Sequence, residues 1–220
     1  MDFLLDGPDP APATVLLAHG AGGAMDSDSM TAIAGALGGR GLRVARFEFG
    51  YMAARRAGRR MPPPRAETLV PEYRAAAAAL GAPPPLVIGG KSMGGRVASM
   101  AADGLLSESA VAGLLCIGYP FHPAGKPAKL RTAHLARLRT PTLICQGSRD
   151  AFGSREEVAG YALSDRIELL WLEDGDHDLK PRKRVTGLTA ADHLATLADA
   201  AAAWAARLRS SAEGGPAGPT

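Results

Sequence analysis

The sequence predicts a doubly wound α/β fold, in which helices flank a mostly parallel sheet. Six short apolar runs alternate along the 220 residues with longer segments of helical period. Most of the runs are apolar at nearly every position, as strands buried on both faces of a parallel sheet must be. With 46% hydrophobic residues, a chain of this length can form one domain with a substantial core.

The expected strands are TVLLAH (14–19), RVARFEF (43–49), LVIGG (86–90), VAGLLCIG (111–118), TLICQG (142–147) and IELLWLE (167–173). A shorter run, FLLD, precedes them and is expected to form a further short strand. The connection between VAGLLCIG and TLICQG is short. We expect one helix there, around 128–138, and no lid domain.

Three amphipathic stripes predict the flanking helices, and we expect each stripe to face the core. Their residues are Met30, Ile33, Ala34 and Leu37; Leu69, Tyr73, Ala76 and Leu80; and Leu194, Leu197, Ala201, Trp204 and Leu208. Thr189 is a suitable N-cap for the last helix.

The domain is expected to span 1–208. Residues 209–220 are rich in Gly, Pro and Ser and are expected to form a disordered tail.

Charge and composition exclude several classes of protein. The net charge of +3 is too small, and the sequence too poor in basic motifs, to favour nucleic acid as a partner. The start of the chain does not resemble a signal peptide, and no run is apolar over the length of a membrane helix, so we expect a cytoplasmic protein without a membrane partner. Cys116 and Cys145 lie in apolar runs and are expected to be buried thiols.

A glycine-rich turn follows the third run, in the stretch PLVIGGKSMGGRVASM. The letters GKS resemble the end of a phosphate-binding P-loop, but the first glycine of that motif would fall on Pro85. Gly90 to Gly94 instead read G-x-S-x-G between a strand and a helix, the pattern of a nucleophile elbow. Glycines two residues before and after the serine leave space for a sharp turn. The pattern favours Ser92 as a nucleophile.

A serine nucleophile needs a histidine base and a carboxylate that orients it. Asp150 follows TLICQG and His177 follows IELLWLE, so both come after strand ends, in the order serine, acid, histidine. Four other acids lie next to His177 and are expected to be solvated or to cap the loop: Glu173, Asp174, Asp176 and Asp178. The sequence therefore predicts a triad of Ser92, Asp150 and His177.

The developing negative charge on a substrate carbonyl needs two backbone N–H donors. Met93, which follows the nucleophile, is expected to supply one. The loop GAGG after TVLLAH is expected to supply the other from Ala21, with Gly22 as the next choice. The alternative is that GAGG is a tight turn without a catalytic role.

Four motifs, LLAHGAGGAMDS, GGKSMGGRVASM, QGSRDAFG and DGDHDLKP, resemble those of the α/β-hydrolase superfamily, and the resemblance extends over about residues 3–208. Within it they look like the dienelactone-hydrolase-like branch. That branch includes the testis-expressed hydrolase-like proteins and a subunit of a nuclear histone-acetyltransferase complex. The resemblance implies the triad given above and no metal or organic cofactor; it does not define a substrate or an oligomeric state.

Two further loops are candidates for substrate contact. Tyr119, Phe121 and His122 follow a strand; the two aromatic residues suit either a pocket wall or the core. Five arginines lie between 55 and 65, at Arg55, Arg56, Arg59, Arg60 and Arg65. They form either a solvated loop or an edge of the site that favours a carboxylate- or phosphate-bearing substrate. Lys91 is expected to lean outward from the elbow.

Together these residues predict a serine hydrolase that cleaves small soluble carboxylic esters, lactones or thioesters through an acyl-enzyme. The absence of a lid and the 5% aromatic content argue against an interfacial lipase. Transfer of the acyl group to another acceptor would use the same residues. The alternative from another class is a non-catalytic binding or scaffold protein that keeps this fold.

Overall fold

The computed structural model describes residues 1–213, and its strands form one sheet in the order β1-β3-β2-β4-β5-β6-β7. The strands are β1 (Leu4–Asp6), β2 (Thr14–Ala18), β3 (Arg43–Phe47), β4 (Leu86–Lys91), β5 (Gly113–Ile117), β6 (Thr142–Gly147) and β7 (Ile167–Leu172). Only β1 pairs antiparallel, with β3; all other pairs are parallel. The predicted doubly wound α/β class and all six predicted strands are confirmed.

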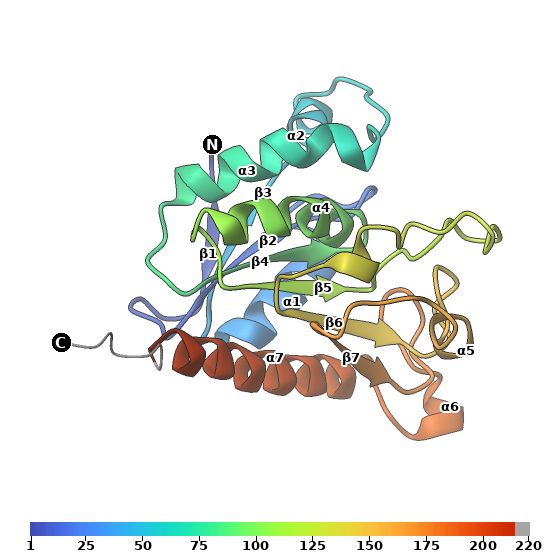
Figure 1. Ribbon diagram of the computed structural model, residues 1–220. Coiled ribbons are helices and arrows are strands. Elements are labelled where there is room, and N and C mark those ends of the chain that lie inside the picture. The colour runs from blue at the N-terminus through green and yellow to red at the C-terminus, as the bar shows by residue number, and fades with distance from the viewer. Residues whose placement is uncertain (214–220) are drawn as a thin grey trace.

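Helices cover both faces of the sheet. They are α1 (Asp28–Gly38), α2 (Gly50–Arg56), α3 (Val70–Leu80), α4 (Met93–Ser107), α5 (Arg155–Val158), α6 (Lys183–Thr186) and α7 (Ala190–Glu213), with 3₁₀ turns at Ala66–Leu69 and Leu135–Arg137. Figure 1 shows α3 and α4 on one side of the sheet and α7 on the other. The side chains of α1 pack into the same apolar cluster as those of α7.

The predicted stripes lie where amphipathic helices must bury them. All four stripe residues of α1 are buried, as are Leu197, Ala201 and Trp204 of α7. Thr189 caps α7, because its hydroxyl accepts the Asp192 N–H at 3.3 Å while its own N–H donates to the Asp192 carboxylate at 2.7 Å. The two layers of helices therefore form two apolar clusters, one on each face of the sheet.

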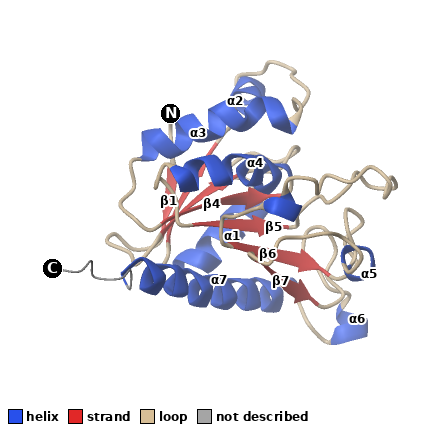
Figure 2. Ribbon diagram, in the orientation of Figure 1, coloured by secondary structure: helices blue, strands red, loops and turns tan. Residues whose placement is uncertain are grey.

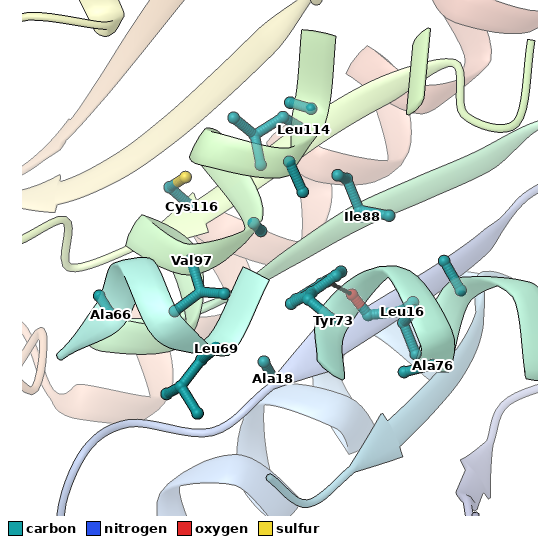
Figure 3. Packing of buried hydrophobic residues seen from close by; sticks show 14 of the residues in the cluster. Leu16, Ala18, Ala66, Leu69, Tyr73, Ala76, Ile88, Val97, Leu114 and Cys116 are labelled. Atoms are coloured by element: carbon teal, nitrogen blue, oxygen red, sulfur yellow. Dashed lines mark hydrogen bonds between the residues drawn. The ribbon is translucent and has the colours of Figure 1, made fainter. Parts of the chain in front are cut away.

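Tyr73 of α3 ties together the two central strands that lead into the functional loops (Figure 3). Its ring is fully buried, and its hydroxyl donates to Leu16 O of β2 at 2.8 Å. The same hydroxyl accepts the Gly89 N–H of β4 at 2.8 Å. A helix on the sheet face thus fixes the relative position of β2 and β4 just before both strands end.

The connection from β5 to β6 differs from the expected helix over 128–138. It contains only the 3₁₀ turn Leu135–Arg137. The Asp103 carboxylate of α4 accepts the N–H groups of Arg139 and Thr140 at 3.0 and 2.9 Å, and Arg131 N donates to Phe121 O at 2.7 Å. The N–H groups of Arg139 and Thr140 lie just after the expected helix. Within it, the Arg131 N–H is bonded to a carbonyl outside the segment, and regular hydrogen bonding is confined to the 3₁₀ turn near its end.

The other end of the chain also differs. Helix α7 continues to Glu213, beyond the predicted domain end at 208. The boundary at 208 and the disordered tail stay predictions. The remaining predicted tail, 214–220, lies outside the described residues.

Cys116 and Cys145 are free and buried, as predicted. Between residues 1 and 213 no helix has both the length and the apolar character needed to cross a bilayer.

Candidate active site

Figure 2 shows the arrowheads of β4, β5, β6 and β7 pointing toward the same edge of the sheet. In open α/β sheets, ligands bind at this edge because the loops after the strands meet there.

The chain reverses sharply at Ser92, between β4 and α4, with φ 52° and ψ −116°. Such a conformation costs a residue with a side chain about 1–3 kcal/mol. Two backbone hydrogen bonds hold Ser92 in this conformation. Its N–H donates to Ile117 O at 2.9 Å, and its carbonyl accepts the Arg96 N–H at 3.1 Å.

The glycines around Ser92 permit this turn. A Cβ at Gly90 would lie 2.5 Å from Ala18 O, and one at Gly94 would collide with the same carbonyl oxygen. The elbow is therefore pressed against the end of β2, where only a residue without a side chain fits. The sharp turn predicted for G-x-S-x-G is present, and it leaves the Ser92 hydroxyl at a cavity.

The three predicted triad residues form one continuous line of hydrogen bonds. His177 Nε2 lies 2.9 Å from Ser92 Oγ, and His177 Nδ1 lies 2.8 Å from Asp150 Oδ2. A carboxylate only accepts, so Nδ1 carries the proton and Nε2 accepts from the serine hydroxyl. The histidine is thus in the tautomer that a general base acting on Ser92 needs.

Asp150 is 1% exposed, and its carboxylate accepts three hydrogen bonds. Besides His177, the carboxylate accepts from Gln146 Nε2 at 3.0 Å and from Phe152 N at 2.8 Å. Gln146 of β6 is itself fixed, because its side chain exchanges hydrogen bonds with Tyr119 N (2.7 Å) and Tyr119 O (3.2 Å). These donors compensate for the loss of hydration around the buried carboxylate.

The loop that carries His177 is braced on both sides. The Asp176 carboxylate accepts the N–H groups of Asp178 and Lys180, each at 2.9 Å. The Asp174 carboxylate is held by Arg182, whose hydrogen bonds lower the pKa of Asp174 to about 2. The predicted loop-capping role of these acids is confirmed for Asp174 and Asp176.

The imidazole of His177 also has close apolar and backbone neighbours. The ring of Phe152 packs against it with centroids 4.2 Å apart. On another side lies Gly118, where an added Cβ would stand 3.0 Å from His177 O and 3.5 Å from its ring. Gly118 has φ 62°, so the position suits glycine for its backbone as well as for the space it leaves.

The glycine loop after β2 faces Ser92 across a cavity of about 270 Å³. The cavity is lined by Gly20, Ala21, Gly22, Gly23, Ser27, Ser29, Met30, Lys91, Ser92, His177 and Asp178. Ala21 and Gly22 are therefore brought to the serine, as predicted for donors of an oxyanion hole. Met93 is the first residue of α4, where an N–H has no partner within the helix.

His19 fixes the first peptide of this loop. Its Nε2 accepts the Phe49 N–H at 3.2 Å, so Nδ1 carries the proton and donates to Gly20 O at 2.7 Å. Burial lowers the pKa of His19 and keeps the ring neutral. The carbonyl and N–H of a trans peptide point in opposite directions, so holding Gly20 O turns the Ala21 N–H away from His19.

Lys91 does not lean outward, contrary to expectation. Its side chain is 11% exposed, and Nζ lies 2.8 Å from Asp178 Oδ1. The hydrogen bond from Lys91 lowers the pKa of Asp178. This ion pair connects the elbow to the loop of His177 and forms part of the cavity wall.

Tyr119, Phe121 and His122 are not among the residues that line the cavity at Ser92, and for the two aromatic residues the structure favours the core over a pocket wall. Tyr119 and Phe121 are fully buried and belong to the apolar cluster under α4, and His122 is 2% exposed. The His122 ring is hydrogen-bonded to Pro123 O at 2.9 Å and faces Glu157 at 3.4 Å. The segment turns inward because its two aromatic rings pack against each other, with centroids 4.9 Å apart, inside this cluster.

The arginine-rich segment is partly helical, since Arg55 and Arg56 lie on α2. The guanidinium of Arg56 binds Asp26 at 2.8 Å and Glu48 at 2.6 Å, and these contacts raise the pKa of Arg56. None of the five arginines is among the residues that line the cavity at Ser92. For Arg56 the structure favours a surface ion-pair network; the preference for anionic substrates stays a prediction.

A second serine–histidine contact lies inside the domain, with Ser99 Oγ 2.8 Å from His134 Nε2. The Ser99 hydroxyl donates to Arg96 O at 2.7 Å, so His134 is the donor toward Ser99. A histidine that donates to a hydroxyl cannot remove its proton. Burial lowers the pKa of His134, and Ser99 is 2% exposed on regular helix. The contact joins a buried serine of α4 to a half-buried histidine and has a structural role.

Three residues with roles at the site were missed from the sequence. Gln146 donates a hydrogen bond to Asp150, and Phe152 packs against the His177 ring. Tyr51 holds the glycine loop, because its O–H donates to Ala21 O at 3.0 Å. For Gln146 a signal was present, because it is a polar residue at the end of an otherwise apolar strand. Phe152 and Tyr51 belong to loop and helix segments whose contacts depend on the tertiary fold.

Comparison with known proteins agrees with this architecture. Similar solved structures include a serine hydrolase without a lid from Xanthomonas campestris (23% identity, 92% of this chain and 88% of that one, TM-score 0.67). Others are a dienelactone hydrolase from Anabaena variabilis (21%, 93% and 90%, TM-score 0.65) and the esterase domain of a Rhodothermus marinus protein (21%, 92% and 91%, TM-score 0.61). At these identities the likeness concerns the fold. The model of the alpha/beta hydrolase domain family matches residues 11–206, and the chain therefore belongs to that family.

Proposed function

We propose that the protein is a serine hydrolase that cleaves small soluble carboxylic esters, lactones or thioesters through an acyl-enzyme. The observation that carries the proposal is the unbroken line from Ser92 Oγ through His177 to Asp150, with distances of 2.9 and 2.8 Å. The strained turn at Ser92 and the burial of Asp150 support it further, because both features cost free energy that folding alone does not require.

In the proposed reaction, Ser92 Oγ attacks the substrate carbonyl carbon and His177 Nε2 takes the hydroxyl proton. The N–H groups of Ala21 and Met93 bind the oxygen on which negative charge develops. When the tetrahedral intermediate collapses, the bond to the leaving alcohol or thiol breaks and His177 returns the proton to it. Water then attacks the acyl-enzyme by the same route and releases a carboxylic acid and free Ser92. Asp150 stabilises the positive imidazole in both steps.

The size of the site supports a small substrate. The cavity beside Ser92 is about 270 Å³, just below the usual range of about 300–1,000 Å³ for small-molecule sites. The connection between β5 and β6, where a lid could be inserted, contains only a 3₁₀ turn. We therefore place small, water-soluble esters ahead of lipid aggregates. A cytoplasmic location stays a prediction.

An active-site-directed fluorophosphonate tests the proposal, because it phosphonylates only a serine that a base activates. Wild-type protein and Ser99→Ala should be labelled, and Ser92→Ala should not. Ser99 is the matched control, since its hydroxyl also contacts a histidine. With a p-nitrophenyl ester, Ser92→Ala should lose about 10³-fold or more in kcat. Folded wild-type protein that is not labelled, or equal labelling of Ser92→Ala, would reject the hydrolase and favour the non-catalytic binding protein.

A further inference from the structure

A second cavity, of about 280 Å³, lies beside the one at Ser92. Its apolar lining comes from four parts of the fold: α1, the end of β5, the loop after His177, and α7. The residues are Ala32, Ile33, Ile117, Leu179 and Leu194. Ile117 ends β5 and Lys91 ends β4, so the cavity opens at the edge of the sheet where this fold class binds ligands.

Three residues, Ser29, Lys91 and Asp178, line both cavities. The two spaces are therefore neighbours across a shared wall, and that wall also borders Ser92 and His177. The aliphatic stem of Lys91 forms part of it, while its ammonium group is held 2.8 Å from Asp178. Because the two cavities adjoin at these three residues, a group of the substrate that extends from Ser92 past Lys91 would reach the second cavity.

The charges around the second cavity balance one another. The lining contains two cationic residues, Lys91 and Lys180, and two anionic residues, Asp28 and Asp178. The ammonium of Lys180 lies 4.0 Å from the Asp178 carboxylate. An anionic or cationic group would therefore gain little from entering, whereas an uncharged hydrocarbon group would bury apolar surface against the lining. The volume is about twice that of the roughly 150 Å³ cavity that holds benzene in a protein interior.

We propose that this cavity is a substrate subsite that binds an uncharged apolar arm of the ester, such as a short alkyl chain or an aromatic ring. The inference rests on the proposed function and adds a preference within it. The arm belongs to either the acyl or the alcohol side of the ester. Each buried methylene should raise kcat/KM roughly fourfold, the effect of its transfer from water, until the cavity is full.

The test uses two series of esters. One series keeps p-nitrophenol as the leaving group and lengthens the acyl chain from acetate to hexanoate. The other keeps the acetyl group and lengthens the alcohol from methyl to hexyl. In wild-type protein, kcat/KM should rise with chain length in one series, and the series that rises identifies the side of the ester that enters the subsite.

Ala32→Phe and Ala190→Phe fill the cavity from α1 and from α7. Both alanines are exposed and line the second cavity but not the one at Ser92, so the variants should fold. Ala203→Phe is the matched control, an exposed alanine on α7 outside both cavities. In the first two variants, the ratio of kcat/KM for the six-carbon ester to that for the shortest ester should fall at least about tenfold. Ala203→Phe should keep the wild-type ratio.

The outcomes separate the two proposals. If wild-type protein hydrolyses acetate esters but shows flat chain-length profiles, or if Ala32→Phe and Ala190→Phe keep the wild-type ratio, the subsite is wrong and the hydrolase stands. If wild-type protein is not labelled by the fluorophosphonate and hydrolyses no ester, both are wrong. A ratio that falls equally in Ala203→Phe also overturns the subsite, because the effect would not come from filling the cavity.

Discussion

The hydroxyl of Tyr51 lies 3.0 Å from the carbonyl oxygen of Ala21 and holds the glycine loop in place. The Gly22 N–H belongs to the same peptide, so fixing the Ala21 carbonyl directs this N–H away from Tyr51. In the same way, His19 holds Gly20 O and directs the Ala21 N–H away from itself. Tyr51 is not among the residues that line the cavity at Ser92. The loop that we expect to bind the oxyanion is thus held by two buried side chains that do not line the cavity.

Replacing Tyr51 by phenylalanine should therefore lower kcat while leaving KM nearly unchanged. Loss of one oxyanion donor costs about 10²–10³-fold, and a donor that is only misaligned should cost less, about tenfold. Steady-state kinetics with a p-nitrophenyl ester measures both constants. Burial raises the pKa of Tyr51 to about 12, so this difference should persist up to about pH 10. Tyr161→Phe is the control, and equal kinetics in the two variants would contradict a positioning role for Tyr51.

Much of the fold could be predicted because it depends on local patterns. Strands buried on both faces must be apolar throughout, and the helices on them must show a stripe, so the runs and stripes identify the elements. The segment 128–138 was predicted wrongly for a physical reason. Within it, Arg131 N donates to Phe121 O, outside the segment, and a local apolar pattern does not reveal such a partner.

The triad residues could be predicted because strand order and motif spacing bring three loops to one edge of the sheet. The residues around them depend on packing that spacing does not determine. Tyr119 and Phe121 follow a strand just as Asp150 does, yet they turn into the core because their rings fill it. Lys91 was expected to lean outward from the elbow, whereas Asp178 holds it at the cavity wall.

Asp150→Asn should reduce kcat by about 10⁴-fold, because an amide can donate to Nδ1 and so favours the tautomer in which Nε2 carries the proton. The amide nearly keeps the shape of the carboxylate, so the variant should remain folded. Glu173→Gln is the matched control. Glu173 is an acid close to His177 in the sequence, but its carboxylate lies 3.1 Å from Arg155. A larger loss of kcat in Glu173→Gln than in Asp150→Asn would contradict the assignment of the acid.

Gly94→Ala should prevent stable folding or cost about 3 kcal/mol or more in the free energy of unfolding. The added Cβ would collide with the backbone of Ala18 and His19, at distances below 3.0 Å. Gly35→Ala on α1 is the control, because a Cβ there has no atom within 4 Å. That variant should gain about 0.5–1 kcal/mol, since alanine favours helix over glycine. Urea denaturation measures both, and equal stabilities would contradict the close approach of the elbow to β2.

The structure predicts that acid weakens the protein through His19. The pKa of His19 is lowered chiefly by burial, so the unfolded chain takes up a proton near pH 6.5 that the folded chain takes up only at lower pH. Stability from this group is therefore complete above pH 6.5 and decreases as the pH falls below it. Protonation would also break the hydrogen bond from Phe49 N to Nε2 and release the peptide that carries the Ala21 N–H.

An NMR titration of the imidazole carbons checks this directly, with His19 assigned by its loss in His19→Asn. The midpoint for His19 in the folded protein should lie below 6.5. The urea midpoint of wild-type protein should fall between pH 7.5 and pH 5.5, and it should fall less in His19→Asn. His134 also has a pKa lowered by burial, so part of the fall should remain in that variant. A midpoint at or above 6.5 for His19 would show that burial does not lower its pKa, and it would contradict the predicted loss of stability through this residue.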